Sequence, residues 1–248
     1  MRFFIEIAYE GSAYHGWQKQ PDAISVQEVL EAALTTALQK KTEVVGAGRT
    51  DTGVHAKQFF AHFDAKIPME ADQFVFKLNT ILPHDVAVIS IFETKKDAHA
   101  RFDAVSREYT YFVSTKKNPF NVASAYYIKK EIDIGLMNEA AKVLLEHTDF
   151  KTFSKVKTEV KTYNCKIEHA FWEKVGDELV FNIKADRFLR NMVRAIVGTL
   201  IDVGTGKTKL KELHKIIESG KRGKAGKSVP AHGLFLTKVE YPKSIRKK

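Results

Sequence analysis

One stretch of the chain combines three glycines with an arginine and an aspartate two residues apart: Gly46-Ala47-Gly48-Arg49-Thr50-Asp51-Thr52-Gly53. Glycines adopt backbone conformations closed to other residues and let a ligand approach the main chain. If Arg49 lies beside Asp51, its charge keeps the carboxylate ionised, and an ionised, positioned carboxylate is a competent nucleophile or base. A tight turn in which Asp51 only accepts backbone hydrogen bonds fits the same pattern. The stretch is therefore either a reactive loop or a structural turn.

The tripeptide Asp51-Thr52-Gly53 also occurs in aspartic proteases. Those enzymes use two carboxylates that share a proton, whereas this chain contains the tripeptide once. A protease would have to assemble its site from two copies of the chain. The neighbouring arginine and the positive net charge have no role in peptide cleavage, so this interpretation is disfavoured.

The sequence contains no metal or cofactor motif. The nine histidines form no His-x-x-x-His or His-x-His pair, and the single cysteine, Cys165, cannot start a zinc cluster. Gly204-Thr205-Gly206-Lys207 does not have the spacing of a phosphate loop, and Gly204 is better explained as a helix C-cap. No dinucleotide motif follows a strand. We expect neither a metal nor a cofactor.

The positive charge of the chain is concentrated at one end. The formal net charge is +10; residues 207–248 contain 13 Lys and Arg against 3 Asp and Glu, whereas residues 1–206 contain 27 of each sign. A basic segment beside a neutral body favours a polyanionic partner, nucleic acid before membrane. A solvated tail is the alternative. Residues 220–228 have no apolar face to insert into lipid.

The sequence favours a cytoplasmic protein without a membrane segment. The longest apolar runs, such as 195–201, are far shorter than the ~18 residues that span a bilayer. Glu6 interrupts the N-terminal apolar stretch too early for a signal peptide. A single cysteine forms no internal disulfide and fits a reducing compartment.

Three clusters place cations beside aromatic rings or beside one another. Arginine with aromatic rings suits flipped bases, and arginines three and four apart share one face of a helix. Each cluster alone has an ordinary interpretation as core, solvated loop or polar helix face, but together they favour nucleic acid. The clusters are Arg101, Phe102, Arg107 and Tyr109; Lys151, Lys155, Lys157 and Lys161; and Arg187, Arg190 and Arg194.

Hydrophobic periodicity predicts two packed α+β halves around one cleft rather than independent modules. The first half reads β-α-β-β-α-β, with Ser25 and Glu28 forming a capping box and Asp72 capping the second helix. Its strands are expected over 2–9, 42–46, 57–64 and 86–92, and its helices over 26–38 and 72–82.

The second half repeats this order more loosely. Gly176-Asp177 predicts the turn of a hairpin, and Asp133 caps a helix that buries Met137, Ala140, Ala141, Leu144 and Leu145. The remaining strands are expected over 107–114, 166–175, 178–185 and 234–241, and the remaining helices over 187–203 and 210–219.

In chain order, these motifs resemble the family of tRNA pseudouridine synthases of the TruA type. The resemblance is highly specific and extends over nearly the whole chain. The matching segments are Tyr9-Glu10-Gly11-Ser12-Ala13-Tyr14-His15-Gly16-Trp17-Gln18, Ser25-Val26-Gln27-Glu28, Ala47 to Ala56, His99 to Phe102, Arg107 to Tyr111, Asp149-Phe150, Met192 to Gly198 and Gly233 to Leu236.

The resemblance implies a fold and an activity. The fold would consist of two ferredoxin-like α/β halves, residues 1–100 and 101–248, whose antiparallel or mixed sheets flank a central basic cleft. The activity would be isomerisation of uridine to pseudouridine at positions 38, 39 and 40 of the tRNA anticodon stem-loop. The family uses no cofactor and no metal, and acts as a homodimer with tRNA across both subunits.

The resemblance also implies roles for single residues. Asp51 matches the catalytic aspartate, Tyr109 the active-site tyrosine and Arg194 the basic residue that pairs with the aspartate; Arg49 would help to hold the substrate. An RNA-binding protein without catalysis remains the alternative, and Asp51 separates the two, because only an enzyme needs that carboxylate. The residues expected to contact RNA are Arg101, Phe102, Arg107, Lys157 and Lys161.

Overall fold

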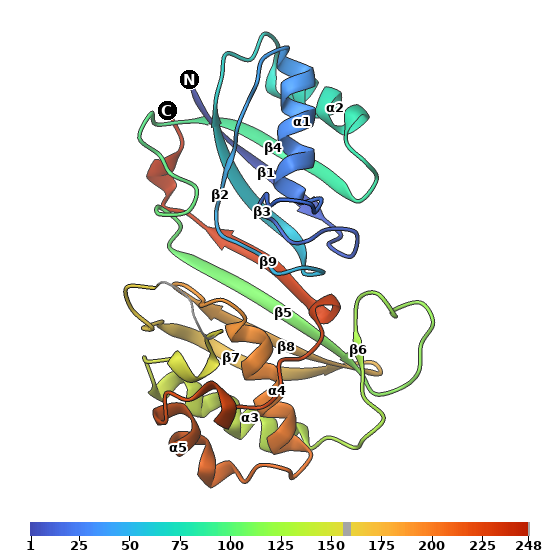
Figure 1. Cartoon of the computed structure of the whole chain (residues 1–248), viewed down its shortest axis with the longest axis vertical. Helices are drawn as coiled ribbons and strands as arrows, with labels where there is room; N and C mark the ends of the chain where they lie inside the picture. Colours follow the sequence, from blue (N-terminus) through green and yellow to red (C-terminus); the bar gives the residue numbers. More distant parts are fainter. Residues whose placement is uncertain (156–159, 248) are drawn as a thin grey trace. The chain divides into compact units, whose positions relative to one another are not determined.

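The computed structural model describes residues 1–155 and 160–247 of the chain. These residues divide into two compact units (Figure 1): Met1–Val105 with the residues from Leu236 onward form unit 1, and Ser106–Phe235 form unit 2. Each unit combines helices with antiparallel strands, which confirms the predicted α+β class. Within the described ranges, no helix is long and apolar enough to cross a membrane.

Unit 1 is built on three antiparallel strands in the order β4 (Val86–Thr94), β1 (Arg2–Tyr9) and β3 (His55–Asp64). Ile5 of β1 is paired with Ile91 of β4 on one side and with Ala61 of β3 on the other. The short strand β2 (Val45–Gly46) also pairs with β3. The strand predicted over 42–46 is therefore present but only two residues long.

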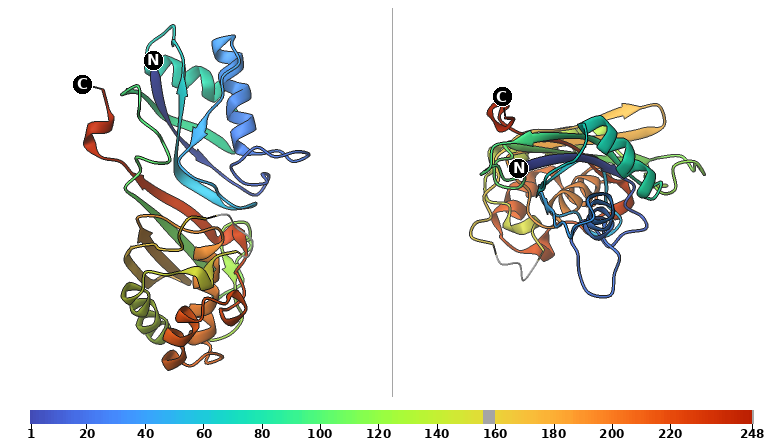
Figure 2. Two further views of the ribbon diagram at one scale, coloured as in Figure 1. Left: turned by 60° about the vertical axis from the view of Figure 1, so that its left-hand side comes forward. Right: turned by 90° about the horizontal axis from the view of Figure 1, so that it is seen from above.

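Two helices cover one face of these strands, and they lie side by side (Figure 2). They are α1 (Val26–Leu38) and α2 (Ala71–Ile81). Helix α1 begins as predicted, because the Ser25 hydroxyl accepts a 3.3 Å hydrogen bond from the backbone N–H of Glu28. The cap predicted for α2 is wrong: Glu70 is the N-cap, without a side-chain hydrogen bond, and Asp72 lies in the first turn, where its charge still favours the helix N-terminus.

The opposite face of the unit 1 strands carries a second apolar cluster that the alternation did not predict. The ring of Tyr241, just after β9 (Leu234–Glu240), packs edge to face on Phe4 and on Phe60, with centroids 5.2 Å apart in both pairs. The backbone N–H of Val239 donates to the Gln58 side chain of β3 at 3.0 Å. Strand β3 is therefore buried on both faces.

Unit 2 contains the antiparallel strands β5 (Ser106–Ser114), β8 (Glu178–Ala185) and β7 (Ile167–Val175), in that order. The two-residue strand β6 (Tyr126–Tyr127) pairs parallel to β5. The predicted β7–β8 hairpin is confirmed, and Gly176 in its turn has a φ of +59°. The pairing sets Tyr109 of β5 opposite Ile183 of β8.

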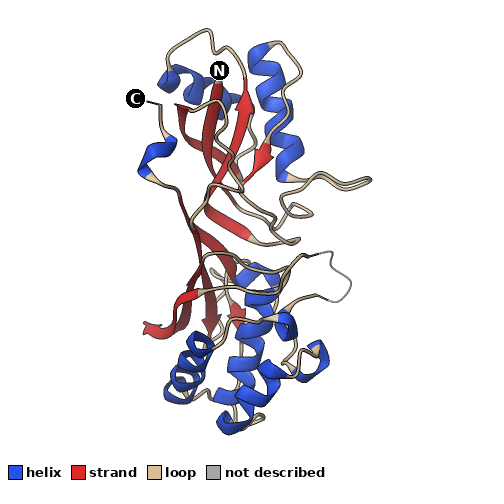
Figure 3. Ribbon diagram, turned by 90° about the vertical axis from the view of Figure 1, so that its left-hand side faces the viewer, coloured by secondary structure: helices blue, strands red, loops and turns tan. Residues whose placement is uncertain are grey.

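Three helices lie beside the strands of unit 2 (Figure 3): α3 (Ile134–Val143), α4 (Met192–Gly204) and α5 (Leu213–Glu218). Asp133 caps α3 as predicted, since its carboxylate accepts a 3.0 Å hydrogen bond from the backbone N–H of Leu136. The prediction that Leu145 faces inward is wrong, because α3 gives way to a 3₁₀ turn at Leu144 and Leu145 is 46% exposed.

The start of α4 differs from the prediction of a helix from Arg187. Asn191 takes a left-handed conformation with a φ of +67°, so the helix begins at Met192. Arg187 and Arg190 precede this break. They do not share a helical face with Arg194, and the predicted three-arginine stripe is wrong.

The end of α4 also departs from the prediction. Gly204 is the last helical residue rather than a left-handed C-cap, and the positive φ of +74° belongs to Gly206. A Cβ on Gly204 would lie 2.6 Å from the side chain of Met137 on α3. The glycine is therefore required by close packing of the two helices.

His62 is a buried titratable group in the second apolar cluster of unit 1. It is 5% exposed, its Nδ1 accepts a 3.1 Å hydrogen bond from the backbone N–H of Ala100, and its ring stacks on Phe4. Burial, reinforced by the positive charge of Arg2, lowers the pKa of His62 from 6.5 to about 4.

This lowered pKa predicts a loss of stability in acid. Because the folded pKa lies below the unfolded one, the contribution of the neutral ring is complete above pH 6.5 and is lost as the pH falls toward 4. We expect His62 to reduce the free energy of unfolding by about 2 kcal/mol between pH 7 and pH 5. Urea unfolding of wild type and His62→Gln at both pH values measures this difference. Parallel pH dependence of the two proteins would contradict it.

Candidate active site

The glycine-rich stretch forms the connection between β2 and β3, and Asp51 lies half-buried within it. The carbonyl of Asp51 accepts a 3.1 Å hydrogen bond from the backbone N–H of Val54, which closes a tight turn. The hydroxyl of buried Thr50 is 2.9 Å from the hydroxyl of Tyr9 on β1. The residue before Asp51 is thus tied to the central strand of unit 1.

A second loop, residues 11–17, packs against this connection backbone to backbone. Gly16 has a φ of +84°, and a Cβ at this position would lie 2.3 Å from the carbonyl oxygen of Thr50. A Cβ on Gly11 would lie 2.1 Å from the carbonyl oxygen of Val54. The N–H of Gly53 donates to the carbonyl of Tyr14 at 3.3 Å. The two glycines of loop 11–17 therefore allow an approach that any side chain would prevent.

Side chains of loop 11–17 anchor it to the rest of unit 1. The Trp17 ring packs on Phe59 of β3 with centroids 4.1 Å apart, and a Cβ on Gly46 would lie 2.4 Å from the Trp17 indole nitrogen. The Tyr14 hydroxyl donates to the Asp85 carboxylate at 2.5 Å. Burial, together with this hydrogen bond, raises the pKa of Tyr14. These contacts fix the loop that supports Asp51.

The sequence suggested that Arg49 and Asp51 form an ion pair. The Arg49 side chain is exposed, and in the described residues it makes no ion pair with Asp51. The two residues are two positions apart in this turn, but the Arg49 side chain is exposed whereas Asp51 is half-buried. A substrate-binding role for Arg49 stays a prediction.

The other two residues singled out for the site lie in unit 2. Tyr109 is half-buried on β5, and its ring meets Phe188 edge to face, with centroids 5.1 Å apart and planes at 90°. Such edge-to-face pairs fix the orientation of both rings. Phe188 falls within the range 187–203 that was predicted as a helix, but it lies in the loop before α4.

Arg194 lies in the first turn of α4 and is clamped to one residue far along the chain. Its Nε donates to the carbonyl of Val229 at 2.8 Å, and its own carbonyl accepts a 3.2 Å hydrogen bond from the N–H of Val229. The sequence carried no signal for Val229, because a backbone carbonyl leaves no mark on residue type. The clamp fixes the guanidinium of Arg194 against the start of α4.

The residues expected to contact RNA have different surroundings. Phe102 is 75% exposed in unit 1; the Arg101 guanidinium lies 5.8 Å from its ring centre, and the His99 and Phe102 ring centroids are 4.3 Å apart. Arg107 of unit 2 donates to the carbonyl of Asp186 at 2.9 Å. Lys161 is exposed, and Lys157 lies outside the described residues.

Metal ligands do not gather in the part of the chain that the structure describes: no group of three or more His, Cys, Asp or Glu could hold an ion there. Lys207 follows the two glycines of the Gly204-Thr205-Gly206-Lys207 segment, which lacks the spacing of a phosphate loop. Its ammonium group donates to both carboxylate oxygens of Asp202 at 3.0 and 2.9 Å. The lysine therefore pairs with a residue in the last turn of α4.

The glycine-supported aspartate of unit 1 and the clamped arginine and packed tyrosine of unit 2 belong to a chain that matches one enzyme family over most of its length. The family model described as tRNA pseudouridine synthase matches residues 6–103 and 140–242. The chain therefore belongs to the tRNA pseudouridine synthases, a family of isomerases, as its motifs predicted.

Individual relatives carry a more particular name. The chain is 53% identical over 246 residues to tRNA pseudouridine synthase A of Bacteroides fragilis, covering 98% of both chains. It is 52% identical over 247 residues to the protein of that name from Bacteroides thetaiotaomicron, covering 98% of this chain and 92% of the relative. With the protein of that name from Bacillus subtilis it shares 40% identity over 245 residues, covering 97% of this chain and 99% of the relative.

The backbone contact at Gly16 can be tested against a glycine that has only a strained φ. Gly16→Ala adds both a left-handed conformation and a clash with Thr50, whereas Gly176→Ala adds only the conformation, because nothing lies within 4 Å of its Cβ position. We expect losses of unfolding free energy of about 3 kcal/mol or more for Gly16→Ala and about 1 kcal/mol for Gly176→Ala. Urea unfolding measures both, and equal losses would show that the contact is not tight.

Proposed function

We propose that this chain acts on tRNA and isomerises uridine to pseudouridine at positions 38, 39 and 40 of the anticodon stem-loop, with Asp51 as the nucleophile. Membership of the family supports the reaction, and the names of the relatives support tRNA as the substrate. The observation that carries the role of Asp51 is its position: a half-buried carboxylate on a turn whose backbone is fixed by a second loop.

The reaction needs such a group. The C1′–N1 glycosidic bond of uridine must break, the freed uracil must turn, and C5 must join C1′ and lose its proton. As the nucleophile, Asp51 attacks C1′ of the ribose; the alternative route has Asp51 as the base that starts glycal formation. A turn whose backbone is fixed favours both routes, because the entropic cost of orienting the carboxylate is already met when the protein folds.

Arg194 and Tyr109 complete the proposed chemistry. Arg194 supplies the basic group that the family motif pairs with the catalytic aspartate, and Arg49 assists in holding the substrate. Tyr109 stacks on the flipped uracil and assists removal of the C5 proton. Its edge-to-face contact with Phe188 supports this role, because it sets the plane in which the ring is presented.

The proposed RNA contacts offset the cost of flipping a base out of its stack, which is a few kcal/mol. The exposed Phe102 with the neighbouring Arg101 suits a base or ribose, and Arg107, Lys157 and Lys161 suit phosphates. The chain would need no cofactor and no metal. A homodimer that binds one tRNA across both subunits, in the cytoplasm where tRNA matures, completes the proposal.

Neutralising Asp51 separates catalysis from binding. Asp51→Asn should abolish tritium release from tRNA transcripts labelled at uracil C5, while tRNA affinity stays within about tenfold, because an amide keeps the shape but loses the nucleophile. Transcripts that carry a labelled uridine at only one of positions 38, 39 and 40 test the three sites separately. Asp72→Asn, an exposed carboxylate on α2, is the matched control and should retain full activity.

The outcomes discriminate between the hypotheses. Turnover retained by Asp51→Asn would contradict the mechanism. Absence of release by wild type, with salt-sensitive tRNA binding intact, would favour an RNA-binding protein without catalysis.

Removing only the Tyr109 hydroxyl tests its part in proton removal. Tyr109→Phe keeps the ring on Phe188, so we expect tRNA affinity to change little and the rate to fall by about a hundredfold, within the usual range for a lost acid–base group. Single-turnover tritium release measures the rate. A loss below threefold would leave stacking as the only role of Tyr109.

A further inference from the structure

The clamp on Arg194 belongs to a longer feature, which we call the α4 strap: residues 222–230, between α5 and β9. By composition this glycine- and lysine-rich segment is typical of a solvated loop. In the structure it lies against the first half of α4. It ends at Pro230, whose carbonyl accepts a 2.8 Å hydrogen bond from the hydroxyl of the fully buried Tyr111 on β5.

Two glycines bring the strap into backbone contact with α4. A Cβ on Gly198 of the helix would lie 1.8 Å from the carbonyl oxygen of Lys227, and a Cβ on Gly226 of the strap would lie 2.7 Å from the carbonyl carbon of Gly198. Neither neighbour is a flexible side chain, so neither can move aside. Both positions require glycine.

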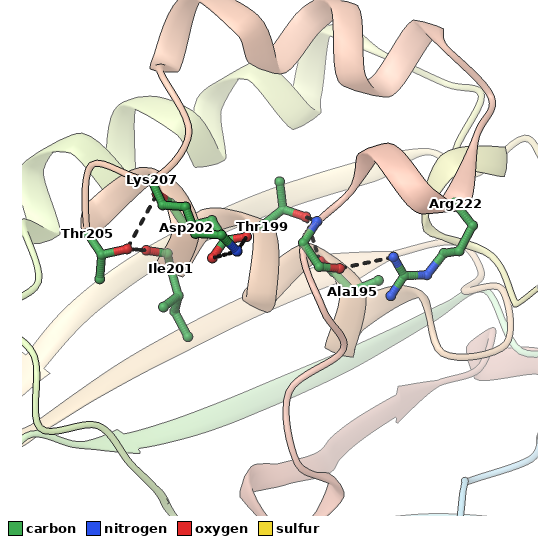
Figure 4. Close-up of polar contacts among 8 residues, drawn as sticks. Ala195, Thr199, Ile201, Asp202, Thr205, Lys207 and Arg222 are labelled. Atoms are coloured by element: carbon green, nitrogen blue, oxygen red, sulfur yellow. Dashed lines mark hydrogen bonds and ion pairs between the residues drawn. The ribbon is translucent and has the colours of Figure 1, made fainter.

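Hydrogen bonds tie the strap to α4 along its length. The N–H of Gly226 donates to the Thr199 hydroxyl at 2.9 Å, and that hydroxyl donates to the carbonyl of Ala195 in its own helix at 2.8 Å (Figure 4). The Asn191 amide, at the N-cap of α4, donates to the Ser228 hydroxyl at 2.7 Å. The strap therefore bonds to α4 on both sides of Arg194.

Arg222 holds the strap in its bent shape. Its guanidinium, seen in Figure 4, donates to the carbonyl of Gly226 at 3.0 Å and to the Ser228 hydroxyl at 2.7 Å. Among the described residues, no carboxylate lies within ion-pair distance of it. Burial lowers the pKa of Arg222. The guanidinium is therefore partly withdrawn from water, and it donates hydrogen bonds to uncharged oxygens of the strap itself.

These contacts converge on the residue that holds Arg194. Arg222 fixes Gly226 and Ser228, the next residue is Val229, and the carbonyl of Val229 accepts from Arg194 Nε at 2.8 Å. We propose that Arg222 is a positioning residue for the isomerisation, and that it acts through the α4 strap by setting the orientation of the Arg194 guanidinium. The inference rests on the role proposed above for Arg194.

The competing interpretation is that Arg222 contacts RNA phosphate, as its place in a basic segment suggests. The two interpretations predict different kinetics. Loss of a phosphate contact weakens tRNA binding and makes it less salt-dependent. Loss of positioning lowers the rate of the chemical step and leaves binding almost unchanged.

The experiment uses two pairs of variants of the full chain. Arg222→Met removes the strap's internal hydrogen bonds, and Lys224→Met removes a neighbouring exposed charge. Gly226→Ala pushes the strap off α4 without a change of charge, and Gly223→Ala adds the same methyl group where nothing lies within 4 Å. Tritium release at saturating enzyme gives the single-turnover rate, filter binding gives the tRNA Kd, and thermal melting reports folding.

We expect Arg222→Met and Gly226→Ala to lower the single-turnover rate by about tenfold with Kd within about twofold, because small displacements of a catalytic group cost rates of this order. Lys224→Met and Gly223→Ala should keep the wild-type rate. If Arg222→Met raises Kd as much as it lowers the rate, or matches Lys224→Met in both, the inference is overturned.

A double-mutant cycle separates positioning from general destabilisation. Arg194→Lys keeps the charge but lacks the Nε–H that Val229 holds, so adding Arg222→Met or Gly226→Ala to it should reduce the rate by less than about twofold. Multiplicative losses would overturn the inference, because they mean that the strap acts elsewhere. If Arg194→Met retains the wild-type rate, the proposed role of Arg194 fails. If Arg194→Met is inactive and the strap variants are fully active, only the present inference fails.

Discussion

The structure depends on one constraint: a polar side chain near the protein surface has little core around it and must be held through its backbone. Unit 1 meets this constraint where Gly16 of one loop touches the carbonyl of Thr50, the residue before Asp51. Unit 2 meets it where Gly198 and Gly226 bring the α4 strap to the helix that carries Arg194. In both units glycine allows the approach, and hydrogen bonds beside it determine the orientation.

The same constraint explains the basic end of the chain. Its composition resembles a tail, but α5, the α4 strap and β9 follow one another through it, with Leu213, Val229 and Leu236 buried. A solvated tail is therefore excluded for this region. The basic residues of this region differ in their surroundings: Arg222 donates hydrogen bonds within the strap, whereas Lys224 and Lys227 are exposed to solvent.

Local pattern predicted what depends on local physics. The amphipathic period of α1, the caps at Ser25 and Asp133, and the β7–β8 hairpin all formed as expected, because each is determined within a few residues. The start of α4 was wrong because apolar spacing continues through 187–203 while Asn191 interrupts the helix with a positive φ. The second apolar cluster was missed because Tyr241 comes from the far end of the chain.

The candidate site shows the same division more sharply. Residue types marked Asp51, and family motifs marked Tyr109 and Arg194, but side-chain identity says nothing about a partner that is a backbone carbonyl. The Val229 carbonyl is such a partner, and its position depends on Gly198, which lies one helical turn beyond Arg194. A glycine in mid-helix normally weakens the helix, so its presence here indicates that the helix gives up some intrinsic stability for contact with the strap.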